Sequence, residues 1–66
     1  MNQEVIGTNA GLIWNALCEP KSLSLKALKK ATKLKDKELY LALGWLAREG
    51  KISFDESTEE LFIVLL

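Results

Sequence analysis

The stretch from residue 36 to residue 54 constrains the fold of this chain more than any other. Three leucines recur in it at steps of three and four residues: Leu39, Leu43 and Leu46. Such spacing places them on one face of a helix. Gly50 then stands where a helix end favours a left-handed residue, and residues 51–54 alternate between polar and apolar side chains. The stretch therefore predicts a helix that ends at a glycine and continues into a strand.

A first helix is predicted over residues 6–19. Its apolar side chains recur at helical steps and are expected to face inward: Ile6, Ala10, Ile13, Trp14 and Leu17. Thr8 or Asn9 is expected to cap its start. Pro20 is expected to end it, because a proline ring disfavours the helical conformation in the residue before it.

A second, amphipathic helix is predicted from Leu25 to about Lys33. A brief extended segment at residues 21–24 precedes it, and Ser24 is expected to be its N-cap. Its inward positions are Leu25, Leu28 and either Ala31 or Thr32. Its outward positions are Lys26, Lys29, Lys30 and Lys33.

The leucine-striped third helix is predicted to begin at Lys35 or Asp36, after a turn anchored by Leu34. Its inward positions are Leu39, Ala42, Leu43, Leu46 and Ala47. Directed sideways or outward are Lys37, Tyr40, Leu41, Gly44, Trp45 and Arg48.

Two strands are predicted beyond this helix, at residues 51–55 and 60–66, joined by a polar connection at residues 56–59. The last six residues are apolar on both faces, so this strand requires cover on both sides. We expect its edge to be unpaired within the chain. Pairing or packing with a second copy would cover it.

Length and cysteine content limit how such a chain can be stabilised. Residues 1–66 are expected to form one domain, whose core supplies only about 3–5 kcal/mol. Cys18 is the only cysteine and histidine is absent, which excludes an intrachain disulfide and a Cys/His zinc site. Cys18 is expected to be a small buried apolar residue. Self-association is therefore the expected source of further stability.

Catalysis, cofactor binding and membrane insertion find no support in the sequence. Without histidine, the chain offers no plausible pair of nucleophile and base, and it has no phosphate-binding glycine loop. No run approaches the roughly 20 apolar residues that span a bilayer, and the first residues lack the features of a signal peptide. We therefore expect a cytoplasmic protein that is not an enzyme and holds no cofactor or metal.

Positive and negative charges are separated along the chain, although the formal net charge is zero. Residues 20–37 contain seven lysines and one aspartate, whereas residues 38–66 contain six acidic and two basic residues. The lysines form a candidate phosphate-binding face. The alternative is that they are the solvated side of a short amphipathic helix.

The order of predicted elements resembles the winged helix-turn-helix domains of bacterial transcription regulators, and more closely a group of short stand-alone bacterial winged-helix proteins of unassigned role. The resemblance covers residues 6–65 and is most specific over residues 39–52, where Gly50 resembles the glycine before the wing. It implies a mainly α fold of three helices with a small β-hairpin wing, in a two- or three-stranded antiparallel sheet.

The same resemblance implies binding to double-stranded DNA, with the third helix in the major groove and the wing at the neighbouring backbone or minor groove. The positions that would face the groove are Asp36, Lys37, Tyr40, Leu41 and Gly44. Together with the lysine cluster, the predicted nucleic-acid-binding residues are Lys26, Lys29, Lys30, Lys33, Lys35, Lys37 and Tyr40.

A protein-interaction module without DNA binding is the alternative. Leu41, Gly44 and Trp45 offer no donors or acceptors to the groove edges, and the carboxylates of the wing would repel phosphates. For the DNA-binding protein as well, we predict a homodimer whose interface contains Leu41, Trp45, Phe62, Val64 and Leu66, although Trp45 alternatively packs within its own chain. The acidic wing is either a solvated loop or a contact for the lysine-rich helix of a neighbouring subunit.

Overall fold

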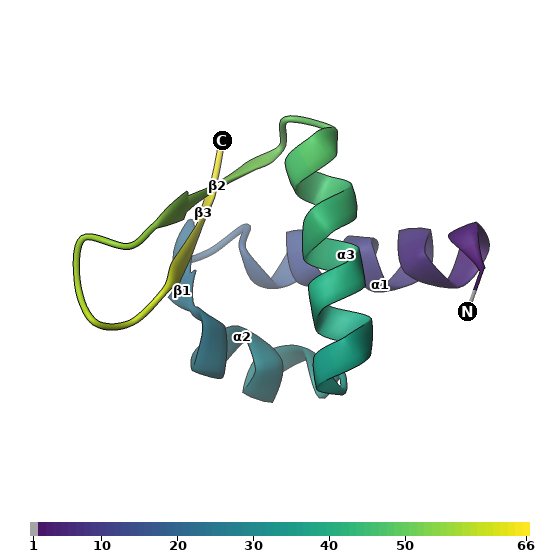
Figure 1. Cartoon of the computed structure of the whole chain (residues 1–66), viewed down its shortest axis with the longest axis horizontal. Helices are drawn as coiled ribbons and strands as arrows, with labels where there is room; N and C mark the ends of the chain where they lie inside the picture. The colour runs from purple at the N-terminus through teal and green to yellow at the C-terminus, as the bar shows by residue number, and fades with distance from the viewer. Residues whose placement is uncertain (1) are drawn as a thin grey trace.

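The computed structural model describes residues 2–66, which form three helices and three strands (Figure 1). The helices are α1 (Gln3–Ala16), α2 (Leu25–Thr32) and α3 (Asp36–Arg48). The strands are β1 (Ser22–Ser24), β2 (Ile52–Asp55) and β3 (Phe62–Leu65). The predicted class, three helices with a small antiparallel sheet, is confirmed. No helix within residues 2–66 has the length and apolar character that a membrane crossing requires.

The predicted path from α3 into a strand is also confirmed. The inward side chains Leu39, Leu43 and Leu46 are each at most 4% exposed. Gly50 has a φ angle of 70°, and the amide of Lys51 donates a hydrogen bond to the carbonyl of Leu46 at 3.1 Å. This pattern is a Schellman motif, which closes the helix and turns the chain into β2.

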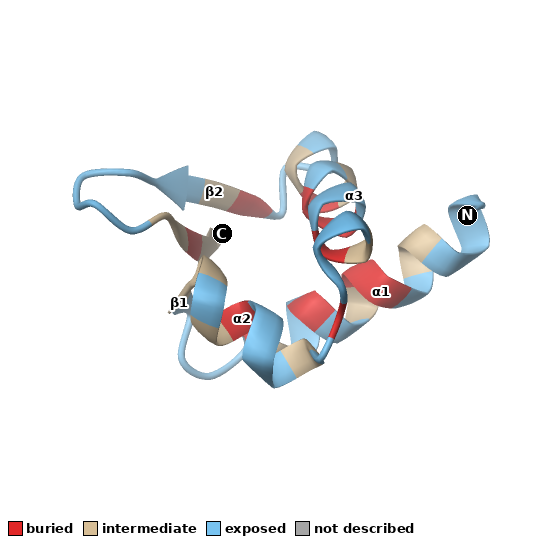
Figure 2. Ribbon diagram, turned by 60° about the horizontal axis from the view of Figure 1, so that its bottom comes forward, coloured by how far each residue is buried: buried red, intermediate tan, exposed pale blue. Residues whose placement is uncertain are grey.

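The core lies where the three helices and the inner face of the sheet meet (Figure 2). Its largest fully buried side chains come from every helix and from β3: Ile13, Leu17, Leu28, Leu39 and Ile63. Figure 2 also shows that the loop between β2 and β3 extends beyond the body of the molecule, and residues 56–60 of this loop are exposed. The helices therefore supply most of the buried apolar surface.

The first helix differs from its prediction at both ends. It begins at Gln3, because the side chain of Asn2 accepts a hydrogen bond from the amide of Val5 at 2.9 Å and so caps the helix in place of Thr8 or Asn9. It ends at Ala16, ahead of Glu19 and Pro20.

Two side chains of this region were predicted to be buried and are exposed. Trp14 is 42% exposed, and the Nζ atom of Lys51 lies 5.8 Å from the centre of its ring. Cys18 is an exposed free cysteine whose thiol donates to the carbonyl of Trp14 at 3.4 Å. The neighbouring core positions are filled by Ile13 and Leu17, so the turn that carries Trp14 and Cys18 faces outward.

The start of α2 agrees with its prediction, since the hydroxyl of Ser24 accepts a hydrogen bond from the amide of Ala27 at 3.1 Å. The helix ends at Thr32, and Lys33 follows in the left-handed conformation with a φ angle of 60°. Of the two predicted inward alternatives, Thr32 is half-buried and Ala31 is exposed. Leu34 is buried and anchors the turn to α3, as predicted.

The predicted free edge of the last strand is wrong, because β3 is the central strand of the sheet, in the order β1-β3-β2. It pairs antiparallel with both neighbours, in registers that include Leu23 with Ile63 and Ile52 with Leu65. A strand apolar on both faces suits this central position. The edges of the sheet are instead β1 and β2, and β3 needs no second copy to pair its backbone.

The loop between β2 and β3 is longer than the predicted connection and spans residues 56–61. Its last residue, Leu61, is tied to the body, because its carbonyl accepts a hydrogen bond from the amide of Leu25 at 2.8 Å. The wing is therefore attached to the start of α2 as well as to the end of α3.

Candidate nucleic-acid interface

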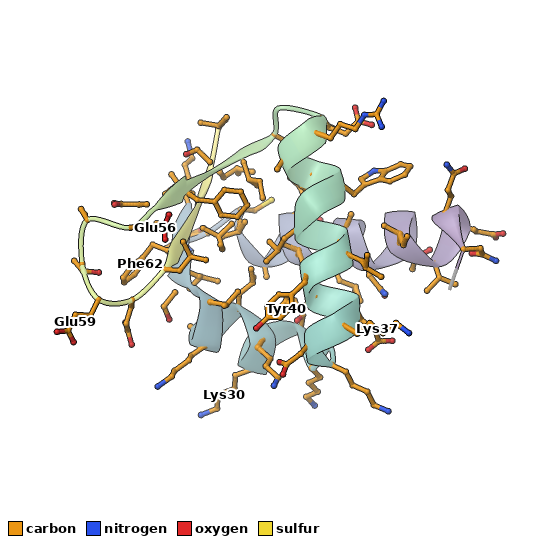
Figure 3. The ribbon with its side chains drawn as sticks, viewed as in Figure 1. Lys30, Lys37, Tyr40, Glu56, Glu59 and Phe62 are labelled. Atoms are coloured by element: carbon orange, nitrogen blue, oxygen red, sulfur yellow. The ribbon has the colours of Figure 1, made fainter. Side chains whose placement is uncertain are left out.

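Six exposed lysines extend from the start of α2, along that helix and through the turn, to the first turn of α3. We call this set the lysine edge: Lys26, Lys29, Lys30, Lys33, Lys35 and Lys37. In Figure 3, Lys30 on α2 and Lys37 on α3 both extend away from the body, with Tyr40 on the surface of α3 close to this edge. The amphipathic pattern of α2 and the sharp turn at Lys33 bring these charges together from three segments of the chain.

One lysine of this edge is paired with an acidic residue. The Nζ atom of Lys29 lies 2.6 Å from a carboxylate oxygen of Asp36, the first residue of α3. This hydrogen bond and the negative charge of Asp36 raise the pKa of Lys29 above its ordinary value. Within residues 2–66, no other side-chain ion pair is present. The pair bridges α2 and α3 and leaves the remaining lysines available to a phosphate backbone.

The outward face of α3 mixes aromatic and aliphatic side chains with the charges. Tyr40 is 54% exposed and Leu41 is 42% exposed. Trp45 is half-buried and packs against the core of its own chain. A face of this kind has few groups that can read the donor and acceptor pattern of base edges.

The structure divides the predicted dimer-interface residues between two surfaces. Leu41 and Trp45 lie one turn apart on α3. Phe62, Val64 and Leu66 alternate with Ile63, which is fully buried, so they belong to the outer face of the sheet, directed away from the helices. The core therefore separates the two groups, and no single patch contains all five.

Four exposed carboxylates gather on the wing: Asp55, Glu56, Glu59 and Glu60. We call this set the acidic wing, and Figure 3 shows Glu59 at the far end of its loop. Asp55 accepts a hydrogen bond from the amide of Ser57 at 2.9 Å. Hydrogen bonds from the hydroxyl and the amide of Ser57 lower the pKa of Asp55 below its ordinary value. Negative charge therefore lies where the resemblance places a contact with phosphates.

A shallow groove separates the lysine edge from the acidic wing. Its lining comes from the start of α2 and the end of the wing loop: Ser24, Leu25, Lys26, Glu59, Glu60 and Leu61. The hydrogen bond between Leu25 and Leu61 forms part of its wall. The two oppositely charged sets are thus neighbours in the fold, although they are far apart in the sequence.

Sequence reasoning missed the exposure of Phe54. Its alternation with Ile52 places it on the inner face of the sheet, and it is opposite Ile63 in the register. It is nevertheless 46% exposed, because it lies closer to the wing tip than Ile52, which is buried. The length of the polar segment after it was the available signal, since a longer loop indicates a hairpin that extends beyond the body.

The turn between α2 and α3, followed by a β-hairpin beside a short first strand, defines the molecule as a winged helix-turn-helix domain. The chain belongs to the family described as winged helix-turn-helix domain (DUF2582), whose model matches residues 1–65. It is also similar to the solution NMR structure of protein BT2368 from Bacteroides thetaiotaomicron. The identity is 34% and the TM-score 0.86, over 98% of this chain and 79% of that chain. No curated protein matches the chain.

Proposed function

We propose that this domain is a non-enzymatic, transcription-associated protein that binds duplex DNA through the lysine edge. The observation that supports the proposal is the set of six exposed lysines along α2, the turn and the start of α3, of which only Lys29 is paired within the described residues. Such a cluster attracts the phosphate backbone and releases its counterions on binding. Tyr40 lies close enough to this edge to add a contact to a sugar or a base.

Contacts to phosphates are expected to dominate over reading of the sequence. Lysines bind phosphates as point charges, and these contacts set position and affinity without distinguishing base pairs. Leu41 and Gly44 occupy groove-facing positions of α3 and offer no donors or acceptors there. The binding we propose is therefore salt-sensitive and weakly selective.

Fluorescence anisotropy with a labelled mixed-sequence duplex tests this proposal. If three to four lysines contact phosphates, the logarithm of the affinity falls against the logarithm of the salt concentration with a slope of roughly −3. Replacing Lys30 and Lys33 by glutamine is expected to flatten the slope by about 2 units, since two phosphate contacts are lost.

The matched control is Lys51→Gln, which removes the same charge beside Trp14, beyond the opposite end of α3. This variant is expected to bind duplex like the wild type. Failure of the wild type to bind duplex at low salt would refute the DNA-binding proposal. A change of slope in Lys51→Gln about half as large as that of the double variant would show that net charge, and not the lysine edge, drives the binding.

A protein-interaction role, with a second copy of this chain as the partner, is the second candidate. It is favoured by large apolar side chains that remain exposed on several elements, including Leu41 at 42%, Phe54 at 46% and Leu66 at 73%. Surface apolar groups of this kind mark interaction sites when they are contiguous, and Leu41 has the half-buried Trp45 as its neighbour one turn along α3. Sedimentation velocity over a range of protein concentrations tests whether the wild type forms a dimer.

A further inference from the structure

One end of the lysine edge borders the same groove as the acidic wing, and no ion pair crosses this groove within residues 2–66. The groove has Lys26 on one side and Glu59 and Glu60 on the other. Within residues 2–66, the ion pair that does form joins Lys29 to Asp36, inside the lysine edge itself. Both charged sets therefore remain exposed on neighbouring surfaces and are complementary in sign.

Apolar side chains accompany the acidic wing on the outer face of the sheet. In the register, Asp55 is opposite Phe62 and Ser53 is opposite Val64, so these side chains share that face. Phe62 and Val64 are only half-buried in the chain. Lysine side chains can cover such apolar surface with their methylene stems while their ammonium groups reach carboxylates. The outer face and wing thus suit a lysine-rich surface as partner.

We infer that the acidic wing of one copy docks on the lysine edge of a second copy, and that the reciprocal contact forms at the same time. A two-fold axis beside the groove places the lysine edge of each copy against the acidic wing of the other, because Lys26 and the wing glutamates border the groove from opposite sides. Each copy then contributes both surfaces to a closed dimer. Phe62 and Val64 lie at the margin of each contact, and Leu41 and Trp45 lie outside it.

This dimer occupies the surface to which we assign DNA binding, so the two states exclude each other. The wing carboxylates take the positions of phosphates on the lysine edge. Duplex and a second copy therefore compete for the same lysines. This consequence rests on the proposed DNA binding, whereas the dimer itself does not.

Charge reversal tests the docking directly. The wing-reversed variant carries Glu56→Lys, Glu59→Lys and Glu60→Lys, and the edge-reversed variant carries Lys26→Glu, Lys30→Glu and Lys33→Glu. All six positions are exposed, and far-UV circular dichroism checks that each variant is folded. The wing-reversed variant alone has two positive surfaces, and in the edge-reversed variant the three remaining lysines and three new glutamates cancel, so each variant alone loses the attraction. An equimolar mixture restores it between the unchanged wing of one chain and the unchanged lysine edge of the other.

Sedimentation velocity at low salt is expected to give a wild-type dimer of twice the 7.4 kDa chain that dissociates as salt is added. Each reversed variant alone should have a dissociation constant at least about tenfold higher, and the mixture should recover the dimer. The matched control Lys51→Glu, which reverses the charge of an exposed lysine outside both charged sets, should dimerise like the wild type. A wild-type monomer at low salt, reversed variants that dimerise normally, or a mixture that stays monomeric would each overturn the inference.

The competition is tested with the exposed Cys18 as a labelling site. Donor- and acceptor-labelled copies report the dimer by energy transfer, whether or not DNA is present. Excess duplex is expected to abolish the transfer as the duplex becomes bound. Transfer that persists while anisotropy shows bound duplex would overturn the shared surface. If duplex does not bind at all, the DNA-binding proposal fails, and the charge-reversal result still decides the dimer.

Discussion

The helical body and the wing of this domain are built on different principles. In the body, Ile13, Leu17, Leu28 and Leu39 are fully buried, at the junctions between helices. In the wing, every residue from Phe54 to Glu60 is exposed. Burial of apolar surface is the main favourable term in folding, so the body carries most of the stability. The wing contributes a surface and not a core.

This difference predicts how substitutions divide. Changes in the body should alter the free energy of unfolding, whereas changes on the wing should alter association with little effect on stability. Four variants or conditions test this division, beginning with the centre of the body and ending at the wing.

Leu39→Ala should cause the largest loss. Leu39 is fully buried between helices, and truncating such a leucine costs about 2–5 kcal/mol through lost burial and the cavity that remains. Leu41→Ala, two residues along the same helix, is the matched control because Leu41 is 42% exposed, and it should change stability by less than about 0.5 kcal/mol. Urea unfolding followed by circular dichroism measures both. Similar losses would contradict the assignment of α3 faces.

Gly50→Ala should destabilise the junction between body and wing. Gly50 has a φ angle of 70°, and an added Cβ would meet nothing within 4 Å, so the cost is conformational, about 1–2 kcal/mol. Gly44→Ala lies within α3, also in open space, and should stabilise by up to about 1 kcal/mol because alanine favours helix. Opposite signs from the same chemical change, measured by thermal unfolding, would support the assigned helix end. A stabilising Gly50→Ala would contradict it.

The body was more predictable from sequence than the sheet because its signals are local. The leucine spacing of α3 and the glycine after it lie within a single stretch, as do Ser24 and the lysine pattern of α2. The predicted free edge of β3 was wrong because strand order depends on pairing between residues that are far apart in the sequence, such as Ser22 with Val64. The hairpin pattern predicted β2 as one neighbour of β3, but no local feature identified β1 as the other.

The sequence predicted which residues belong to the candidate site, but it did not predict how they are arranged in space. The lysines of α2 were predicted to point outward, and they are exposed. The closeness of Lys26 to the acidic wing could not be predicted, because the groove lies between segments far apart in the sequence that are joined by the pairing of β1 with β3 and the hydrogen bond between Leu25 and Leu61. The prediction that Trp14 faces inward was wrong because helical spacing defines the buried face only to within one neighbouring position, and Trp14 lies next to the buried Ile13.

Ser24→Ala should lower the free energy of unfolding less than Leu39→Ala or Gly50→Ala does, because Ser24 lies at the boundary of body and sheet. Its hydroxyl caps α2 through the amide of Ala27, and loss of such a cap costs about 1 kcal/mol. Ser22→Ala is the matched control on the same strand, at an exposed position, and should lie within about 0.5 kcal/mol of the wild type. Urea unfolding compares the two. Equal stabilities of the two variants would remove the cap from the account of α2.

The smallest effect on the free energy of unfolding is expected when acidification protonates Asp55 on the wing. The pKa of Asp55 is below the ordinary 3.8 because the hydroxyl and the amide of Ser57 donate hydrogen bonds to its carboxylate. A lowered pKa in the folded state contributes stability above the unfolded pKa, and this contribution is lost as the pH falls through the folded pKa. An NMR titration of the Asp55 carboxyl should therefore show a midpoint below 3.8.

Ser57→Ala should raise that midpoint by removing the hydroxyl donor. Thr58→Ala should not, because the Thr58 hydroxyl donates instead to the carbonyl of Glu60. If the Asp55 midpoint moved equally in both variants, the conformation of the turn as a whole, and not the Ser57 hydroxyl, would determine the pKa of Asp55.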